Sequence, residues 1–215
     1  MEVLEGEFKM KIEFNFLEDL FGIKRDKFIP LKIKGDMEYE LQIRVQEIEN
    51  EGFKILRTER NKNGEIVIIY RHFFYDGNDE DMITIEAIVI TKKGIIIPYP
   101  VMYVNRREAD KSLYIADIRV FGESINKGYG SLMMKELLQI ARSQKEKVFF
   151  VTGNMDYGDE EHYKRLIHFY EKYGFTCRDG KILWINDGVK LSGEQVDAIF
   201  SRVVLEDPEI FEYEK

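Results

Sequence analysis

Five consecutive residues, Lys127-Gly128-Tyr129-Gly130-Ser131, have the composition of an anion-binding turn. They follow a segment with strand character, YIADIRV, and precede LMMKELLQIA, whose apolar residues have the spacing of one helical face. A glycine turn between a strand and a helix leaves the first N–H groups of the helix without intrahelical partners, at the positive end of its dipole. We therefore expect this turn to receive an anion, most naturally a phosphate, which the glycines allow to approach the main chain.

Two common phosphate-binding motifs do not fit this turn. A dinucleotide-binding G-x-G-x-x-G would need a third glycine where the chain has Met133. A P-loop would need a lysine after its last glycine, whereas Lys127 precedes Gly128. Both motifs are excluded.

The stretch instead resembles the acetyl-CoA motif of the GCN5-related N-acetyltransferases (GNAT). In that family, a strand ending in Val is followed by Arg/Gln-x-x-Gly-x-Gly/Ala, which opens a long helix. Val120, Gly128 and Gly130 are in register with this motif, but Ile125 stands at the Arg/Gln position.

A second stretch, FYEKYGF from Phe169, resembles the end of a later helix of the same family. There, a tyrosine is followed four and five residues later by Gly-Phe, as Tyr170 is by Gly174-Phe175. The two motifs occur in the family's order and cover roughly residues 112–186.

The resemblance implies an α/β (α+β) fold, with a mixed, mostly antiparallel sheet and helices on both faces. We expect a single acyl-CoA N-acyltransferase-like domain over residues 1–215. It would comprise a divergent, strand-rich N-terminal part (1–80), a core (82–186), and a C-terminal helix and tail (187–215).

The resemblance also implies a cofactor site for acetyl-CoA between the strand of Val120 and the strand VFFV. The backbone at Ile118 and Val120 would bind the acetyl-pantetheine. The pyrophosphate would be bound by the turn and its amides: Asn126, Lys127, Gly128, Tyr129, Gly130 and Ser131. An alternative is an empty turn whose glycines serve packing.

Asn154 stands roughly where the family often has a pantetheine-binding asparagine. Its separation from Tyr170 is longer than usual, so cofactor contact and ordinary turn residue remain alternatives.

Tyr170 matches the family's general acid. A phenol with a pKa of about 10 is protonated at neutral pH and can donate to a leaving thiolate. The alternative is a core aromatic on the helical face of Tyr163 and Ile167.

Asp117 is the candidate base, but Ala116 occupies the position of a frequent catalytic Glu. The alternative is that Asp117 has a structural role and that the amine is deprotonated through water.

Composition narrows the class of protein. The chain has 215 residues and a net charge of −8, which argues against nucleic-acid and anionic-membrane partners and weakly favours a cationic acceptor. Cys177 is the only cysteine, so an intramolecular disulfide and a C-x-x-C metal site are excluded, and we expect it to be a small buried hydrophobe. The three histidines lack metal spacing, and we expect no metal cofactor.

The expected function is therefore transfer of an acetyl group from acetyl-CoA to a primary amine of a small molecule or peptide. The alternative is a non-catalytic acyl-CoA-binding or regulatory domain; a purely structural interaction module would have no affinity for CoA. No signal segment and no stretch of about 18 apolar residues is found, so a cytoplasmic protein is expected, and a homodimer is compatible with the sequence.

Alternation of apolar residues predicts strands in the N-terminal half, over 7–16, 31–47, Phe53–Arg60 and Ile66–Tyr75, with a short helix over 17–24. Asn63-Gly64 predicts a tight hairpin turn with positive φ at both residues. A further hairpin is expected from Met82–Thr91 and Ile95–Val104, interrupted by Pro98 and Pro100.

The C-terminal half predicts a strand over Lys147–Val151, a polar loop over Thr152–Glu161, and a helix from about Glu160 to Tyr173, ended by Gly174. Asp179-Gly180 predicts a hairpin turn. Ser192 and Gln195 predict the capping box of a last helix ending near Val203.

Overall fold

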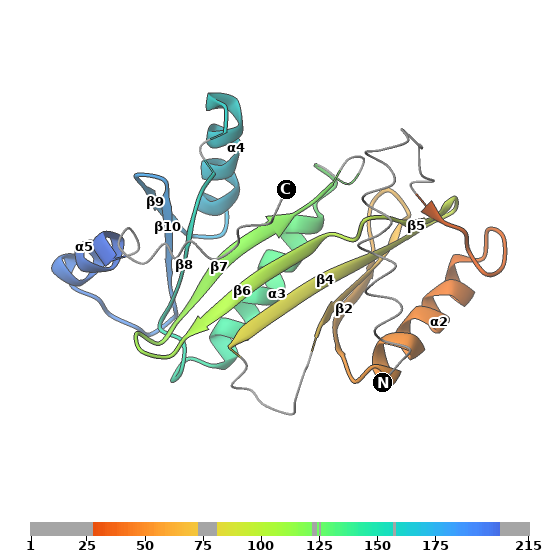
Figure 1. The fold of residues 1–215 in the computed structure, drawn as a ribbon, viewed down its shortest axis with the longest axis horizontal. Helices are drawn as coiled ribbons and strands as arrows, with labels where there is room; N and C mark the ends of the chain where they lie inside the picture. The colour runs from red at the N-terminus through yellow and green to blue at the C-terminus, as the bar shows by residue number, and fades with distance from the viewer. Residues whose placement is uncertain (1–27, 73–80, 122–123, 125, 157, 203–215) are drawn as a thin grey trace, which may run out of the picture.

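The computed structural model describes residues 28–202, except 73–80, 122–123, 125 and 157. Within this part, ten strands form one sheet, accompanied by four helices (Figure 1). The strands are β1 Phe28–Ile29, β2 Lys54–Arg60, β3 Ile66–Arg71, β4 Met82–Thr91, β5 Gly94–Ile96, β6 Val101–Arg107, β7 Ser112–Arg119, β8 Phe150–Asn154, β9 Thr176–Arg178 and β10 Lys181–Ile185. The helices are α2 Met37–Asn50, α3 Tyr129–Ser143, α4 Glu160–Glu171 and α5 Gly193–Arg202.

The sheet is mixed and mostly antiparallel, as predicted. Its order is β1-β5-β4-β6-β7-β8-β10-β9, with β3 paired to β4 and β2 paired to β3. Among the strands of the described residues, only β7 and β8 run parallel, and α3 makes the crossover between them.

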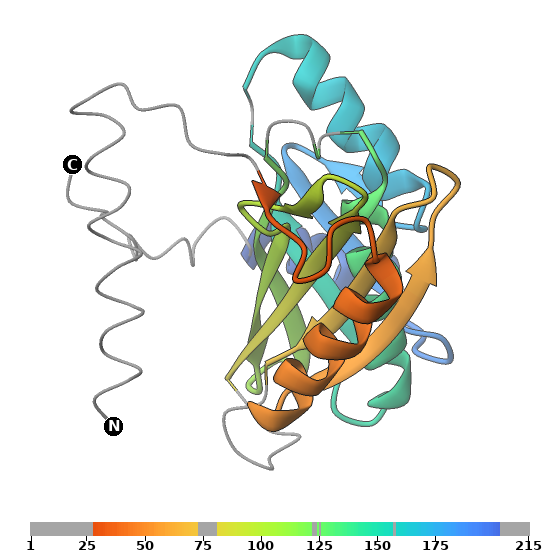
Figure 2. The ribbon, with the colours of Figure 1, turned by 90° about the vertical axis from the view of Figure 1, so that its right-hand side faces the viewer.

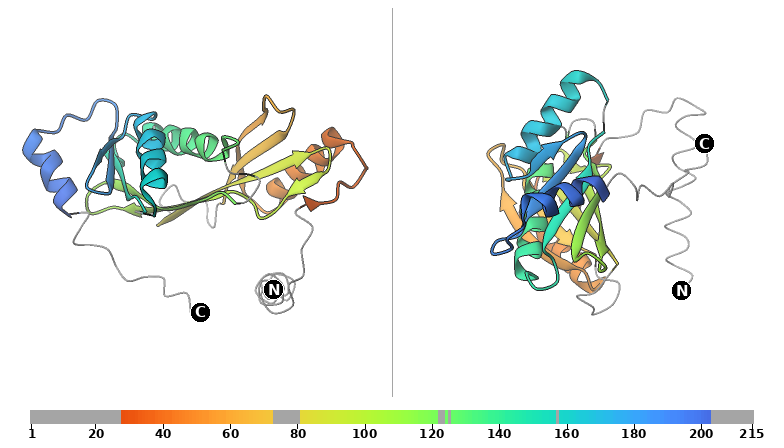
Figure 3. Two further views of the ribbon diagram at one scale, coloured as in Figure 1. Left: turned by 90° about the horizontal axis from the view of Figure 1, so that it is seen from above. Right: turned by 90° about the vertical axis from the view of Figure 1, so that its left-hand side faces the viewer.

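Helices cover both faces of the sheet, which also confirms the prediction. On β3, Val67 and Ile69 are buried in the same cluster as α3 and α4, whereas the alternate residues Ile66 and Ile68 are buried with α2. On β10, Leu183 packs with α5 and so faces away from the cluster of α3 and α4. Figure 2 shows α2 alongside β2, and Figure 3 shows α3 and α4 on the same side of the central strands.

The prediction of a strand over 31–47 is wrong, because most of this stretch belongs to α2. Asp36 caps the helix by accepting a hydrogen bond from a backbone N–H in the first turn. Arg44 pairs along the helix with Glu40 (2.8 Å) and Glu47 (2.7 Å), at the spacings that bring side chains together on a helix surface. The cap and these pairs outweigh the period-2 pattern.

Two predicted hairpin turns are present, with one difference in geometry. Asp179 and Gly180 both have positive φ (48° and 76°), as expected for a two-residue turn. In the β2–β3 turn, Gly64 has a φ of 76° but Asn63 does not have positive φ. Asn61 closes this longer turn, since its carbonyl accepts from the Gly64 N–H (2.9 Å).

Other boundaries follow the prediction closely. The strand Met82–Thr91 is confirmed, and the segment after it is split into β5 and β6 around Pro98 and Pro100. The strand expected over 147–151 begins instead at Phe150 and continues to Asn154, so it occupies the start of the expected loop.

The predicted helix ends are confirmed. Gly174 has a φ of 82° just beyond α4, and the Phe175 N–H donates to the Tyr170 carbonyl (3.2 Å). Ser192 and Gln195 form the expected capping box before α5. The strand predicted over 7–16 and the helix over 17–24 lie outside the described residues.

No helix among the described residues is long and apolar enough to cross a membrane.

Candidate active site

The site begins where the parallel strands part. β7 and β8 are paired from Ser112 opposite Phe150 to Ile115 opposite Gly153. Beyond this point β7 continues to Arg119, paired with β6 only. The backbone groups on the β8 side of residues 116–119 thus have no strand partner within the described residues, and they can bind an extended ligand.

A bulge marks the same position on β7. Tyr103 of β6 pairs with Asp117 and Val104 pairs with Ile115, so Ala116 is the extra residue. Ala116 is exposed, and Ile118 and Val120 are half-buried. The bulge therefore turns the strand at the opening, and the two residues expected to bind pantetheine lie just beyond it.

The glycine turn lies at the start of α3. Gly128 is the N-cap, with a φ of 92°, and no side chain caps the helix there. An added Cβ would be strained by this left-handed φ, although it would meet nothing within 4 Å. At Gly130 an added Cβ would lie 3.9 Å from both Phe169 and Val120, an ordinary contact. The N-terminal amides of α3 are accordingly open to an anion.

Ser124 adds a polar group to this turn. It is fully buried, and its Oγ finds no hydrogen-bond partner in the described part of the chain. Its carbonyl accepts from the Lys127 N–H (3.4 Å), so it belongs to the same turn. A buried hydroxyl without a partner is uncommon in proteins, and a ligand at the turn would supply one.

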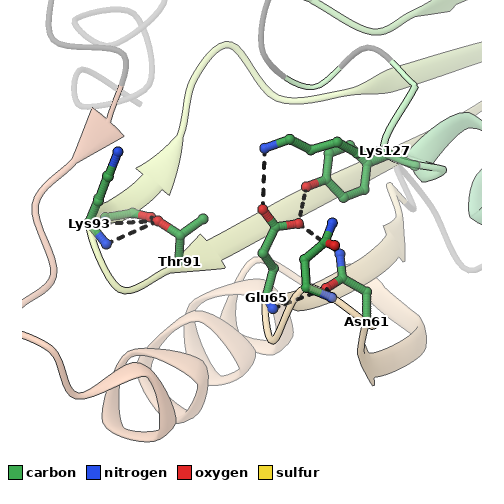
Figure 4. A network of polar contacts seen from close by, with 8 residues as sticks. Asn61, Glu65, Thr91, Lys93 and Lys127 are labelled. Atoms are coloured by element: carbon green, nitrogen blue, oxygen red, sulfur yellow. Dashed lines mark hydrogen bonds and ion pairs between the residues drawn. The ribbon is translucent and has the colours of Figure 1, made fainter.

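The side chains of Lys127 and Tyr129 point to a residue that sequence reasoning missed. Glu65, in the β2–β3 connection, accepts from the Tyr129 hydroxyl (2.6 Å) and from Asn61 Nδ2 (2.7 Å), and its other oxygen lies 3.3 Å from Lys127 Nζ (Figure 4). Burial alone would raise the pKa of Glu65, but these hydrogen bonds and the ammonium outweigh it, so that the pKa is lowered. Glu65 is thus ionised, and it neutralises the one cation of the turn. The predicted contact of Lys127 with phosphate stays a prediction.

Tyr170 lies in the core, in the same cluster as Leu113 and Ile115 of β7 and Val151 of β8. It is 5% exposed and packs edge-on against Phe169 and Phe175. Burial, and then the nearby acidic groups of Cys177 and Asp117, raise the pKa of its phenol well above the usual value. Tyr170 is therefore protonated throughout the neutral range, which a proton donor requires. It is also a core aromatic, so both of its predicted roles fit its position.

Asp117 lies on β7, one residue after the bulge. Its side chain is 41% exposed and forms an ion pair with Arg119 (2.6 Å). Asp117 is close enough to Tyr170 for its charge to contribute to the raised pKa of that phenol.

The remaining sequence candidates are placed as follows. Asn154 is the exposed last residue of β8, directly after Gly153, and is paired with Lys181 of β10. It lies at the opening, and its two alternative roles stay open.

Cys177 is half-buried, and burial, followed by the charge of Glu171, raises the pKa of its thiol to about 11. Such a thiol is a poor nucleophile, in agreement with the expected packing role.

The two sequence motifs meet in space at the ends of α3 and α4. The Tyr173 hydroxyl donates to the Ser131 carbonyl in the first turn of α3 (3.3 Å). Beside this contact is a groove of about 460 Å³, lined by Asn126, Glu161, Lys164, Arg165, His168, Phe169 and Lys172. Apart from Asn126, these residues share one face of α4. Within the described residues, no group of three or more His, Cys, Asp or Glu could hold a metal ion.

Comparison with known proteins agrees with this geometry. Residues 72–175 match the profile of the Acetyltransferase (GNAT) family. The chain therefore carries a GNAT domain, and the matched range contains the glycine turn, the β7–β8 opening and Tyr170.

One curated protein is similar to this chain over part of its length. The uncharacterized protein YocC of Bacillus subtilis is 40% identical over 83 residues, which are 36% of this chain and 47% of YocC. The chain thus matches about half the length of this curated relative.

Among solved structures, a PaiA N-acetyltransferase of Thermoplasma acidophilum in complex with coenzyme A has a TM-score of 0.35 at 13% identity, covering 48% of this chain and 58% of that one. A cAMP-binding acyltransferase of Mycobacterium smegmatis has a TM-score of 0.45 at 12% identity, covering 78% of this chain and 59% of that one.

Proposed function

We propose that the chain is an N-acetyltransferase that moves the acetyl group of acetyl-CoA to a primary amine. The observation that carries this proposal is the opening between β7 and β8, together with the uncapped turn between β7 and α3 and with Tyr170 in the core cluster that contains residues of both strands. The GNAT family match over 72–175 supports acetyl transfer as the reaction class.

The chain offers groups suited to each part of acetyl-CoA. The unpaired backbone edge at Ile118 of β7 and at Val120, just after β7, would hold the pantetheine arm by main-chain hydrogen bonds, much as a strand would. The amides of residues 126–131 would bind the pyrophosphate, and the buried Ser124 hydroxyl would gain a partner. Asn154, at the far side of the opening, is a further candidate for the pantetheine.

The reaction needs one proton donor and one proton acceptor. Acetyl-CoA supplies the thioester, whose carbon–sulfur bond breaks as the amine nitrogen bonds to the carbonyl carbon. The phenol of Tyr170 gives its proton to the departing sulfur. The attacking nitrogen loses one proton, to Asp117 directly or to water, and the solvent returns a proton to Tyr170.

A second candidate is an acyl-CoA-binding or regulatory domain without turnover. Two observations favour it: a buried phenol such as Tyr170 is a weaker acid than an exposed one, and Ala116 offers no carboxylate at the bulge. This candidate predicts affinity for acetyl-CoA without release of thiol.

We regard the N-terminal part as belonging to the same domain, since β1 to β3 are strands of the same sheet as the core.

The acceptor of the acetyl group would be a small molecule or a peptide, and the net charge of −8 on the chain favours a cationic acceptor.

The test is the variant Tyr170→Phe, which keeps the aromatic packing and removes the donor. Its matched control is Tyr163→Phe on the same helix, where the lost hydroxyl accepts from the Gly180 N–H (3.2 Å). Thiol release is measured across a panel of amines, and acetyl-CoA affinity by calorimetry. We expect Tyr170→Phe to lower turnover by about 10² to 10⁴-fold with little change in affinity, and the control to keep its turnover.

Full activity of Tyr170→Phe would remove Tyr170 from the mechanism. Binding of acetyl-CoA without thiol release by the unmodified protein, with every amine, would favour the regulatory candidate. The absence of any acetyl-CoA binding would refute both.

A further inference from the structure

The groove beside α4 gathers positive charge on a chain that is acidic overall. Its lining holds three cations, Lys164, Arg165 and Lys172, against one carboxylate, Glu161. All four side chains belong to exposed residues. Two of these cations have carboxylate partners along the helix: Arg165 is 3.7 Å from Glu161, and Lys164 is 2.6 Å from Glu160. Both pairs are solvent-exposed and therefore weak, so a phosphate can compete for these donors.

The glycine turn next to this groove has no positive charge to spare. Lys127 is its one cation, and the ammonium is paired with the ionised Glu65. Ile125, two residues earlier, carries no charge. The turn can therefore offer amide dipoles to the pyrophosphate but no free cation, whereas coenzyme A also carries a separate ribose 3′-phosphate.

Asn126 connects the two features. It belongs to the turn, with a φ of 61°, and it also lines the groove. A nucleotide whose pyrophosphate lies on the turn would thus continue directly into the groove. Its volume of about 460 Å³ falls within the range of small-ligand sites, roughly 300 to 1,000 Å³. Phe169 provides an aromatic surface there, and Lys164, Arg165 and Lys172 provide donors for a phosphate.

We propose that the α4 groove is the binding site for the ribose 3′-phosphate of coenzyme A, and that Lys164, Arg165 and Lys172 supply the positive charge that Glu65 withdraws from the glycine turn. This proposal rests on the proposed function. It makes α4 a determinant of specificity, which distinguishes CoA from dephospho-CoA, the analogue lacking only the 3′-phosphate.

The experiment compares CoA with dephospho-CoA by calorimetry on the full chain. The variants are Lys164→Gln, Arg165→Gln, Lys172→Gln and the triple variant. The control is Lys145→Gln, which removes the same charge from an exposed position beyond the far end of α3. Adenosine 3′,5′-bisphosphate serves as a third ligand, since it carries the 3′-phosphate without the pantetheine.

We expect the unmodified protein to bind CoA at least about tenfold more tightly than dephospho-CoA. The triple variant should lose most of this preference by weakening CoA binding alone, and Lys145→Gln should keep it. Adenosine 3′,5′-bisphosphate should compete with CoA in the unmodified protein and not in the triple variant.

Equal loss for CoA and dephospho-CoA would overturn the assignment, because the cations would then serve the pyrophosphate. Unchanged binding of both ligands in the triple variant would also overturn it. If the unmodified protein bound neither ligand, the proposed function itself would fail, a result distinct from the loss of selectivity.

Discussion

Replacing Glu65 by glutamine tests how the β2–β3 connection controls the cofactor turn. The carboxylate accepts three side-chain hydrogen bonds, and the partner Tyr129 is only 1% exposed. A hydrogen bond to a charged acceptor contributes about 1.5 to 3 kcal/mol, whereas a neutral one contributes about 1 kcal/mol. The Lys127 pair is partly exposed and adds less than about 1 kcal/mol. We expect Glu65→Gln to lower the free energy of unfolding by about 1 to 3 kcal/mol.

The same substitution should act in the opposite direction on cofactor binding. With Glu65 neutral, the Lys127 ammonium loses its counter-charge beside the glycine turn, and it becomes available to a phosphate. Acetyl-CoA should therefore bind as tightly or up to about tenfold more tightly, while the protein melts roughly 2 to 4 °C lower for each kcal/mol lost. The assays are thermal unfolding and calorimetry, with Glu59→Gln on the neighbouring β2 as control, where a partly exposed 3.4 Å pair with Arg57 is lost.

The pH dependence gives an independent check. The pKa of Glu65 is lower in the folded protein than in the unfolded chain, so its stabilising effect is complete above the unfolded pKa of about 4.3 and is lost as the pH falls through the folded value. The stability difference between the parent protein and Glu65→Gln should be constant near neutral pH and shrink below about pH 4. A Glu65→Gln protein with unchanged stability, or with weaker binding of acetyl-CoA at full stability, would refute this account of the turn.

Three further substitutions have defined outcomes. Gly128→Ala should cost roughly 1 to 2 kcal/mol of stability because of its φ of 92°, whereas Gly130→Ala, with ordinary helical space, should be neutral or stabilising; chemical denaturation of both variants checks the contrast. Asn186→Ala should cost about 2 to 4 kcal/mol, since the buried Nδ2 donates to the carbonyls of Ala141 and Val148 (2.8 Å each); a loss below 1 kcal/mol would mean that water replaces the amide.

The elements that the sequence predicted well are those specified by nearby residues. The turn at Asp179-Gly180, the end of α4 at Gly174 and the capping box at Ser192 each depend on backbone chemistry within a few positions. The α2 stretch was mispredicted because Leu41, Ile43 and Val45 alternate like a strand, while the helix is decided by a cap and by charge pairs. The hydrophobic period alone does not show whether an alternating apolar pattern or a helix cap with charge pairs decides the structure.

The residues of the candidate site likewise include some that short motifs predict and some that they do not. The glycine turn and Tyr170 were found because each belongs to a short motif. Glu65 was missed because its bond to Tyr129 spans 64 positions, a distance at which a single sequence holds no pairing signal. The α4 groove was within reach, since Glu161, Lys164 and His168 recur at the spacing of one helical face.

The parallel pairing of β7 with β8 also bears on how the chain folds. The strands from β2 to β7 pair as antiparallel neighbours over connections that are shorter than the crossover from β7 to β8, which lowers the entropic cost of bringing them together. β8 joins β7 only after the whole of α3 has crossed the sheet, so its contacts have the longer loop to close. We infer that the opening that would hold the cofactor takes shape late, when the C-terminal strands dock onto a sheet that is already formed.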